Sequence, residues 1–201
     1  EYHGAALRRA REAEMTIQAL EGVRVLELGE GVSAAFCAKL FADYGAEVIK
    51  LEVPGAGDIT RRWGPFPGDV AHPEKSGTFY CLNTNKRGIT LDLNAPRGKE
   101  LFIELVGKSD VVVENFSPRG MRNLGFDYER LAQVNPRLIM VSMSCFGHSG
   151  PWRDFVGFGY VFDQVGGAAA VSGYEGGPPT HMMAASDVTS GIMAVYAILL
   201  A

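Results

Sequence analysis

The sequence predicts an α/β fold with an open, mostly parallel sheet and helices on its faces. Apolar segments of strand character alternate with helix-like segments between residues 22 and 144, an order typical of α/β sheets. The first strand, the first helix and the second strand form a complete βαβ unit, whose crossover requires parallel strands. A glycine-rich turn after the first strand makes the expected fold Rossmann-like.

The strands are predicted from short apolar runs bounded by turn-forming or charged residues. They cover residues 22–29, 46–52, 88–93, 110–116 and 138–144. Apolar residues recur at every fourth position from 32 to 44, which predicts a helix that Gly45 is suited to end. Pro96 favours the start of a second helix. Asp127 is expected to cap a short third helix, and an apolar helix is expected to begin near Asp187.

Two long segments are expected to be irregular, because proline and glycine are frequent in them: residues 53–87 and 145–186. Residues 1–20 have the composition of a solvated linker or extension. Residues 21–201 then form the Rossmann-like part. The apolar run at 192–201 ends without a polar cap, so we expect the chain to be a C-terminally truncated piece of a longer protein.

Composition excludes several classes of protein. The 201 residues carry a net charge of −4 and are 47% apolar, which argues against disorder and against a general nucleic-acid binder. The three cysteines are far apart in the sequence, so a disulfide framework is not expected and a cytoplasmic location fits best. The sequence predicts neither a secretory signal nor a membrane span.

The first βα turn has two open interpretations. It matches the pattern G-x-G-x-x-A between Gly29 and Ala34, and Glu52 ends the next strand. This arrangement is typical of a dinucleotide site, in which the acid binds ribose hydroxyls. A tight turn that simply needs glycine explains the same residues. Either way, ligands of open α/β sheets bind at this edge.

Basic residues gather in the middle of the chain, where some could meet a phosphate-bearing ligand and others could form a solvated rim. They are Lys50, Arg61, Arg62, Lys75, Lys86, Arg87, Arg97 and Lys99. The four histidines have no metal-ligand spacing with cysteine or acidic residues, so no metal site is expected.

Asp187 also has two interpretations. At the start of a helix it could be an N-cap that accepts backbone N–H groups. Its position after a glycine-rich stretch also suits a carboxylate that faces a cavity. A helix N-terminus would keep that carboxylate ionised, and an ionised carboxylate can act as a covalent nucleophile.

Six linked motifs resemble the family III CoA-transferases, which include formyl-CoA:oxalate and carnitine CoA-transferases. From about Leu20 to Ala201 they read GVRVLELG, GAEVIKLEVPGAGD, LNTNKRGITLDL, DVVVENFSPRGMRNLGF, NPRLIMVSMSCFGHSGP, and SGYEGGPPT before AASDVTSG. The chain departs from the family pattern at Ser33-Ala34-Ala35, where many members have Ala-Gly-Pro. It also departs at Cys145, where a glycine is usual, and at Asn123, where an arginine is common.

The resemblance implies transfer of coenzyme A between an acyl-CoA and a small carboxylic acid. Asp187 would be the nucleophile and would carry an aspartyl-CoA thioester. The positions that match CoA contacts are Val32, Ser33, Leu91, Asp92, Asn94, Asn115, Phe116, Ser117 and Arg122. The resemblance also implies an incomplete family fold, an interlocked homodimer of the full-length protein, and an oxyanion-binding glycine loop after Ala201.

Three other functions compete with this one. An α-methylacyl-CoA racemase uses an opposed His and Asp, but residues 155–159 hold no histidine where those relatives have one. A non-catalytic CoA-binding module suits a chain that is only part of a domain. An NAD-dependent dehydrogenase would follow from the glycine pattern alone.

Overall fold

The computed structural model describes residues 18–180 and 185–201. Its sheet has five parallel strands in the described residues, in the order β3-β2-β1-β4-β5. They are β1 (Arg24–Glu27), β2 (Glu47–Glu52), β3 (Arg87–Thr90), β4 (Val111–Glu114) and β5 (Ile139–Ser142). The predicted α/β fold and its five strands are confirmed, with each strand somewhat shorter than expected.

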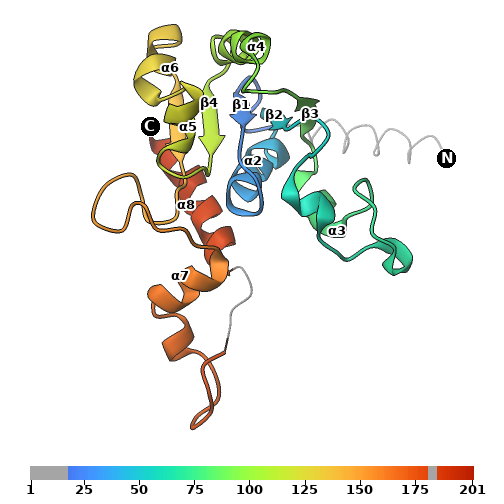
Figure 1. The fold of residues 1–201 in the computed structure, drawn as a ribbon, viewed down its shortest axis with the longest axis vertical. Helices are drawn as coiled ribbons and strands as arrows, with labels where there is room; N and C mark the ends of the chain where they lie inside the picture. Colours follow the sequence, from blue (N-terminus) through green and yellow to red (C-terminus); the bar gives the residue numbers. More distant parts are fainter. Residues whose placement is uncertain (1–17, 181–184) are drawn as a thin grey trace, which may run out of the picture.

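Helices cover both faces of the sheet (Figure 1). One face packs on α2 (Ser33–Asp43) and α8 (Ala185–Leu200), and the other on α4 (Pro96–Val106), α5 (Gly120–Leu124) and α6 (Tyr128–Val134). Alternate side chains of each strand pack into one core or the other, because successive residues of a strand point to opposite faces. Val111 and Val113 lie in the α2 and α8 core, whereas Val112 lies in the other.

The two segments predicted as irregular each contain a helix, so this part of the prediction is wrong. Residues 53–87 include α3 (Gly77–Asn83), and residues 145–186 include α7 (Gly159–Val165). Both helices are seven residues long, too short to show a clear helical period. The Ser76 side chain caps α3 by accepting the Phe79 N–H at 3.0 Å. The short α5 was also not expected from the sequence.

The expected linker over residues 1–20 lies mostly outside the described residues. Its last residue, Leu20, packs against the core formed by α2 and α8. Within residues 18–180 and 185–201, no helix combines the length and the apolar character that crossing a membrane would require.

Candidate active site

The first βα turn is shaped by its glycines. Gly31 has a φ of +78°, a conformation that side chains rarely adopt. A Cβ atom on Gly29 would lie 2.1 Å from the Cβ of Ala34 and 2.8 Å from the Asn115 side-chain oxygen. The pattern G-x-G-x-x-A therefore has a structural explanation, because glycine lets the end of β1 approach both α2 and β4.

Asn115, the residue after β4, ties this turn to the neighbouring strand. Its Oδ1 accepts the Glu30 N–H at 3.0 Å, and its Nδ2 donates to the Glu30 carbonyl at 2.7 Å. The same Nδ2 group donates to the Ser33 Oγ at 3.1 Å. The backbone N–H groups at the start of α2 have no side-chain cap, so they face the edge where a phosphate or an amide of a ligand could bind.

A close approach between α2 and α8 brings Asp187 to this turn. Gly191 of α8 is buried, and a Cβ atom there would lie 3.0 Å from the Ser33 carbonyl oxygen and 3.2 Å from the Cys37 backbone nitrogen. Asp187 lies one helical turn earlier, in the first turn of α8. The packing of two helices far apart in sequence thus places Asp187 beside Ser33.

The result is a cavity of about 520 Å³, called here the Asp187 cavity. Of the residues predicted from the sequence, it brings together Val32, Ser33, Asn115, Phe116 and Asp187. Cys145, which departs from the family pattern, lines it as well.

The structure corrects the N-cap interpretation of Asp187. It is a helical residue within α8 rather than the N-cap. Its pKa is raised from the usual value, because burial and then the nearby charge of Asp163 disfavour the ionised form and oppose the helix N-terminus. Asp163, on α7, is only 3% exposed, and its Oδ2 has no hydrogen-bond partner among the described residues. Ser186 joins the two helices by donating to the Gly159 carbonyl at 3.1 Å.

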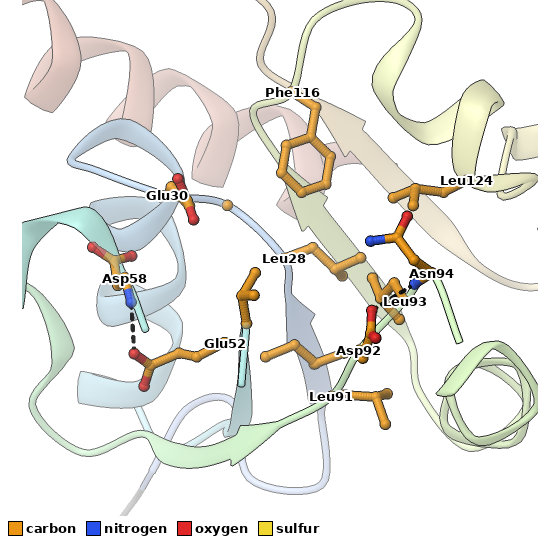
Figure 2. Close-up of a pocket in the computed structure, with 13 residues that line it drawn as sticks. Leu28, Glu30, Glu52, Asp58, Leu91, Asp92, Leu93, Asn94, Phe116 and Leu124 are labelled. Atoms are coloured by element: carbon orange, nitrogen blue, oxygen red, sulfur yellow. Dashed lines mark hydrogen bonds between the residues drawn. The ribbon is translucent and has the colours of Figure 1, made fainter. Parts of the chain in front are cut away.

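A second cavity of about 150 Å³ lies between the carboxyl ends of the strands and is called here the strand-end cavity (Figure 2). It contains the predicted Leu91, Asp92 and Asn94, which follow β3. Glu30 and Phe116 line both cavities, so the two adjoin at the end of β1 and β4. Asp92 holds the chain after β3 in place by accepting the Asn94 N–H at 2.9 Å.

Two predicted contact residues lie outside both cavity linings. Ser117 and Arg122 are exposed and belong to the segment between β4 and the end of α5. Their contact with CoA stays a prediction.

Glu52 is not free to bind a ribose. Its carboxylate accepts two hydrogen bonds from the Arg61 guanidinium, at 2.6 and 2.8 Å, and one from the Asp58 N–H at 2.8 Å. Figure 2 shows the bond between Asp58 and Glu52. Although burial opposes ionisation of Glu52, these hydrogen bonds hold the pKa of its carboxyl below the usual value. The dinucleotide interpretation of the first turn therefore lacks its acidic partner.

Lys50 and Lys86 were expected either to meet a phosphate or to form a solvated rim. Neither interpretation fits, because their side chains are only 2% exposed. Both pair with Glu27 of β1, at 2.6 and 2.7 Å. Lys50 also pairs with Asp58 at 2.8 Å and donates to the Gly29 carbonyl at 3.1 Å. These lysines are neither a phosphate site nor a solvated rim, because both are buried and paired with carboxylates inside the fold.

Several residues of the site were not expected from the sequence. Glu30 was not singled out, although it is the variable residue of the glycine-rich turn and such positions face the ligand edge. Asp163 lies within a segment predicted as a loop, so nothing marked it as buried. Trp63 and Phe162 line the Asp187 cavity from segments that were expected to be irregular. Within the part of the chain that the structure describes, no group of three potential metal ligands is found.

Comparison with known proteins gives a consistent answer. The family model described as CoA-transferase family III matches residues 20–201. A succinyl-CoA–D-citramalate CoA-transferase from Chloroflexus aurantiacus is 44% identical over 81% of this chain and 40% of its own length. A formyl-CoA:oxalate CoA-transferase from Streptomyces avermitilis is 42% identical over 92% of this chain and 44% of its own length.

Solved structures agree with the sequence relatives. The crystal structure of a CAIB/BAIF family protein from Brucella suis has a TM-score of 0.83 and 35% sequence identity, and it covers 90% of this chain and 48% of that one. The chain thus spans about half or less of the length of the relatives it matches. The family model covers nearly the whole chain, and we conclude that the chain belongs to CoA-transferase family III.

Proposed function

We propose that the protein containing this chain transfers coenzyme A from an acyl-CoA thioester to a free carboxylic acid, with Asp187 as the nucleophile. The observation that carries the proposal is the position of Asp187. Its carboxyl lines a cavity together with Ser33 and Asn115 from the ligand-binding edge of the sheet. Family membership supports the reaction class.

The proposed chemistry proceeds through covalent intermediates on Asp187. A carboxylate oxygen attacks the thioester carbonyl, the C–S bond breaks, and a mixed anhydride and CoA thiolate form. The thiolate then attacks the aspartyl carbonyl carbon, which releases the donor acid and leaves an aspartyl-CoA thioester. The acceptor carboxylate repeats the two steps in reverse, giving the new acyl-CoA and free Asp187.

The raised pKa of Asp187 suits this role. A carboxylate of higher basicity is a stronger nucleophile once ionised. Burial, which raises the pKa of Asp187, also removes water that would otherwise compete for the anhydride. The family's oxyanion-binding glycine loop would stabilise the tetrahedral intermediates.

We propose that the nucleotide part of CoA lies in the strand-end cavity and that the thioester enters the Asp187 cavity. The two cavities adjoin at Glu30 and Phe116, which allows one extended ligand to occupy both. The uncapped start of α2 offers N–H groups along this route. The contacts would come from Val32, Ser33, Leu91, Asp92, Asn94, Asn115, Phe116, Ser117 and Arg122.

The competing functions have less support. A racemase needs a base opposite Asp187, and the described residues that line the Asp187 cavity include no histidine. A dehydrogenase needs an acid for the ribose, and Glu52 is held by Arg61. An interlocked homodimer and a cytoplasmic location remain part of the proposal, on the resemblance to the family.

The test is acyl exchange in the intact protein. With an acyl-CoA and an isotopically labelled acid, label should enter the CoA ester, and hydroxylamine should trap an adduct on the Asp187 peptide in mass spectrometry. Asp187→Asn, which has nearly the same size, should abolish both. Loss of α-deuterium from the acyl-CoA without exchange would indicate a racemase instead. CoA binding with neither reaction would indicate a binding module.

A further inference from the structure

The Asp187 cavity is lined mainly by large apolar side chains. They come from the segments after β2, β4 and β5 and from α7 and α8, and include Trp63, Phe116, Met143, Phe158, Phe162 and Met193. Three of the segments are remote in sequence from Asp187, so the apolar lining is a product of the fold. Aromatic and thioether groups of this kind bury apolar ligand atoms favourably.

The charged groups in this cavity are carboxyls. Among the described residues that line it, Glu30 and Asp187 are the charged side chains, and no lysine, arginine or histidine is present. The polar groups that accompany them are small and neutral, such as Ser33, Asn115 and Ser144. A ligand carboxylate in this part of the cavity would therefore meet like charges and apolar surface.

Two basic side chains, Lys50 and Arg62, act on Glu30, and each already has a partner within the chain. Lys50 is buried and paired with Glu27 and Asp58. Arg62 is exposed, lies outside the cavity lining and donates to the Ala56 carbonyl at 3.2 Å. The charge of Arg62 acts on Glu30, which lines the cavity.

We propose that the acyl group accepted by the Asp187 cavity is uncharged and apolar, an aliphatic or aromatic monocarboxylic acyl group. This inference rests on the proposed function, since the cavity receives an acyl group only if Asp187 attacks an acyl-CoA. A dicarboxylic acyl group would bring a second carboxylate that no lysine, arginine or histidine among the described lining residues could pair with. An unpaired charge in a desolvated site is strongly disfavoured.

The substrate class indicated by the cavity differs from the acids for which relatives are named. One relative is named for succinyl-CoA and D-citramalate, and another for formyl-CoA and oxalate. The cavity volume of about 520 Å³ leaves room for a group much larger than formyl. Size and charge therefore both favour an extended apolar acyl chain.

The test compares two donors that are nearly equal in size and differ in terminal charge. Pentanoyl-CoA with labelled pentanoate and succinyl-CoA with labelled succinate are assayed separately on the intact protein. The expected kcat/KM for the pentanoyl pair is about 10- to 100-fold higher, as one unpaired like charge implies. An equal or higher value for the succinyl pair would overturn the inference.

Calorimetric binding of both CoA esters separates this inference from the proposed function. If neither pair exchanges label, transfer of both test acids is disproved, while tighter binding of pentanoyl-CoA still supports an apolar cavity. Equal or tighter binding of succinyl-CoA disproves the apolar cavity whether or not exchange occurs.

Two variants locate the cause of the preference. Met193→Arg adds a cation to the lining and should raise the succinyl-to-pentanoyl ratio of kcat/KM at least about 10-fold, whereas the matched Met193→Leu should leave the ratio unchanged. Arg62→Leu should also leave it unchanged. A selective loss of succinyl transfer in Arg62→Leu would show that Arg62 recruits a second carboxylate, and the inference would fail.

Discussion

The side chain of Asn115 forms a reciprocal pair of hydrogen bonds with the backbone of Glu30, at 3.0 Å to its N–H and 2.7 Å to its carbonyl. Glu30 lies in the turn after β1, and Asn115 follows β4. The adjacent strands β1 and β4 thus hold the glycine-rich turn from one side. This pair fixes the backbone where the two cavities adjoin.

Replacing Asn115 should weaken this turn. Asn115→Ala removes both bonds to Glu30 and the bond to Ser33, so the free energy of unfolding should fall by about 1–2 kcal/mol. Asn115→Asp keeps the acceptor but loses the donor, and it adds a negative charge beside the proposed path of CoA. Urea unfolding measures the first effect, and CoA titration by calorimetry measures the second.

The stability loss should be similar in both Asn115 variants or smaller in Asn115→Asp, whereas the loss of CoA affinity should be larger in Asn115→Asp. Unchanged CoA affinity in both would show that the turn does not contact the ligand.

Gly191 should tolerate no larger side chain, because its Cα faces the backbone of α2. Gly191→Val would force α8 away from Ser33 and Cys37, and we expect a loss of about 1–3 kcal/mol in the free energy of unfolding. The exposed Ala197→Val in the same helix is the control and should lose only about 0.5 kcal/mol through helix propensity.

Gly191→Val should also reduce acyl exchange more than it reduces CoA binding, because it displaces Asp187 rather than the strand-end cavity. Equal stability of Gly191→Val and the control variant would show that α8 does not depend on this close contact.

Asp163 should influence the pH dependence of the reaction. Burial first, and Asp163 second, raise the pKa of Asp187. The nucleophile acts only when ionised, so activity falls as pH drops through this pKa. Asp163→Asn removes the repulsion, and the acid limb of the kcat/KM profile should shift to lower pH.

If Asp163→Asn changes the rate equally at every pH, the residue supports packing between α7 and α8 and does not tune Asp187. Asp163→Glu, which retains the charge, should keep the acid limb near its original position.

Lys86 should contribute to stability in a defined pH window. Burial lowers its pKa from 10.5 to about 8. Between these two values the unfolded chain binds more protons than the folded protein, so the stability contribution of Lys86 rises as pH increases from about 8 to 10.5. This stability contribution of Lys86 is lost as pH falls through the pKa of Lys86 in the folded protein.

Urea unfolding of wild type and Lys86→Met across this range measures the effect. The difference in unfolding free energy, wild type minus variant, should increase with pH over the window. The exposed Lys75→Met is the matched control, since its side chain is not buried in the fold. A flat difference for Lys86→Met would mean that Lys86 keeps an ordinary pKa in the folded protein.

Much of the fold was accessible from local patterns. Four strands were found because buried parallel strands are continuous apolar runs, and β3 was found from the alternating pattern of residues 88–93. The helix α2 was found because its apolar residues repeat at helical spacing. The helices α3 and α7 were missed because seven residues carry too little periodicity. Asp187 was singled out from its position at a helix start, and Ser33 and Asn115 were named from family motifs. Their meeting in one cavity could not be derived from their spacing.

By itself, the sequence determined the alternation of strands and helices, the parallel direction of the first βαβ unit, the need for glycine after β1 and the family of the chain. These depend on residue type and near neighbours. Tertiary structure alone decided the strand order, the burial of Lys50 and Lys86 against Glu27, the pairing of Glu52 with Arg61 and the charge that Asp163 places near Asp187. The physical reason is that burial and long-range pairing set the energy of a charge, and neither is encoded in the identity of a residue or its immediate neighbours.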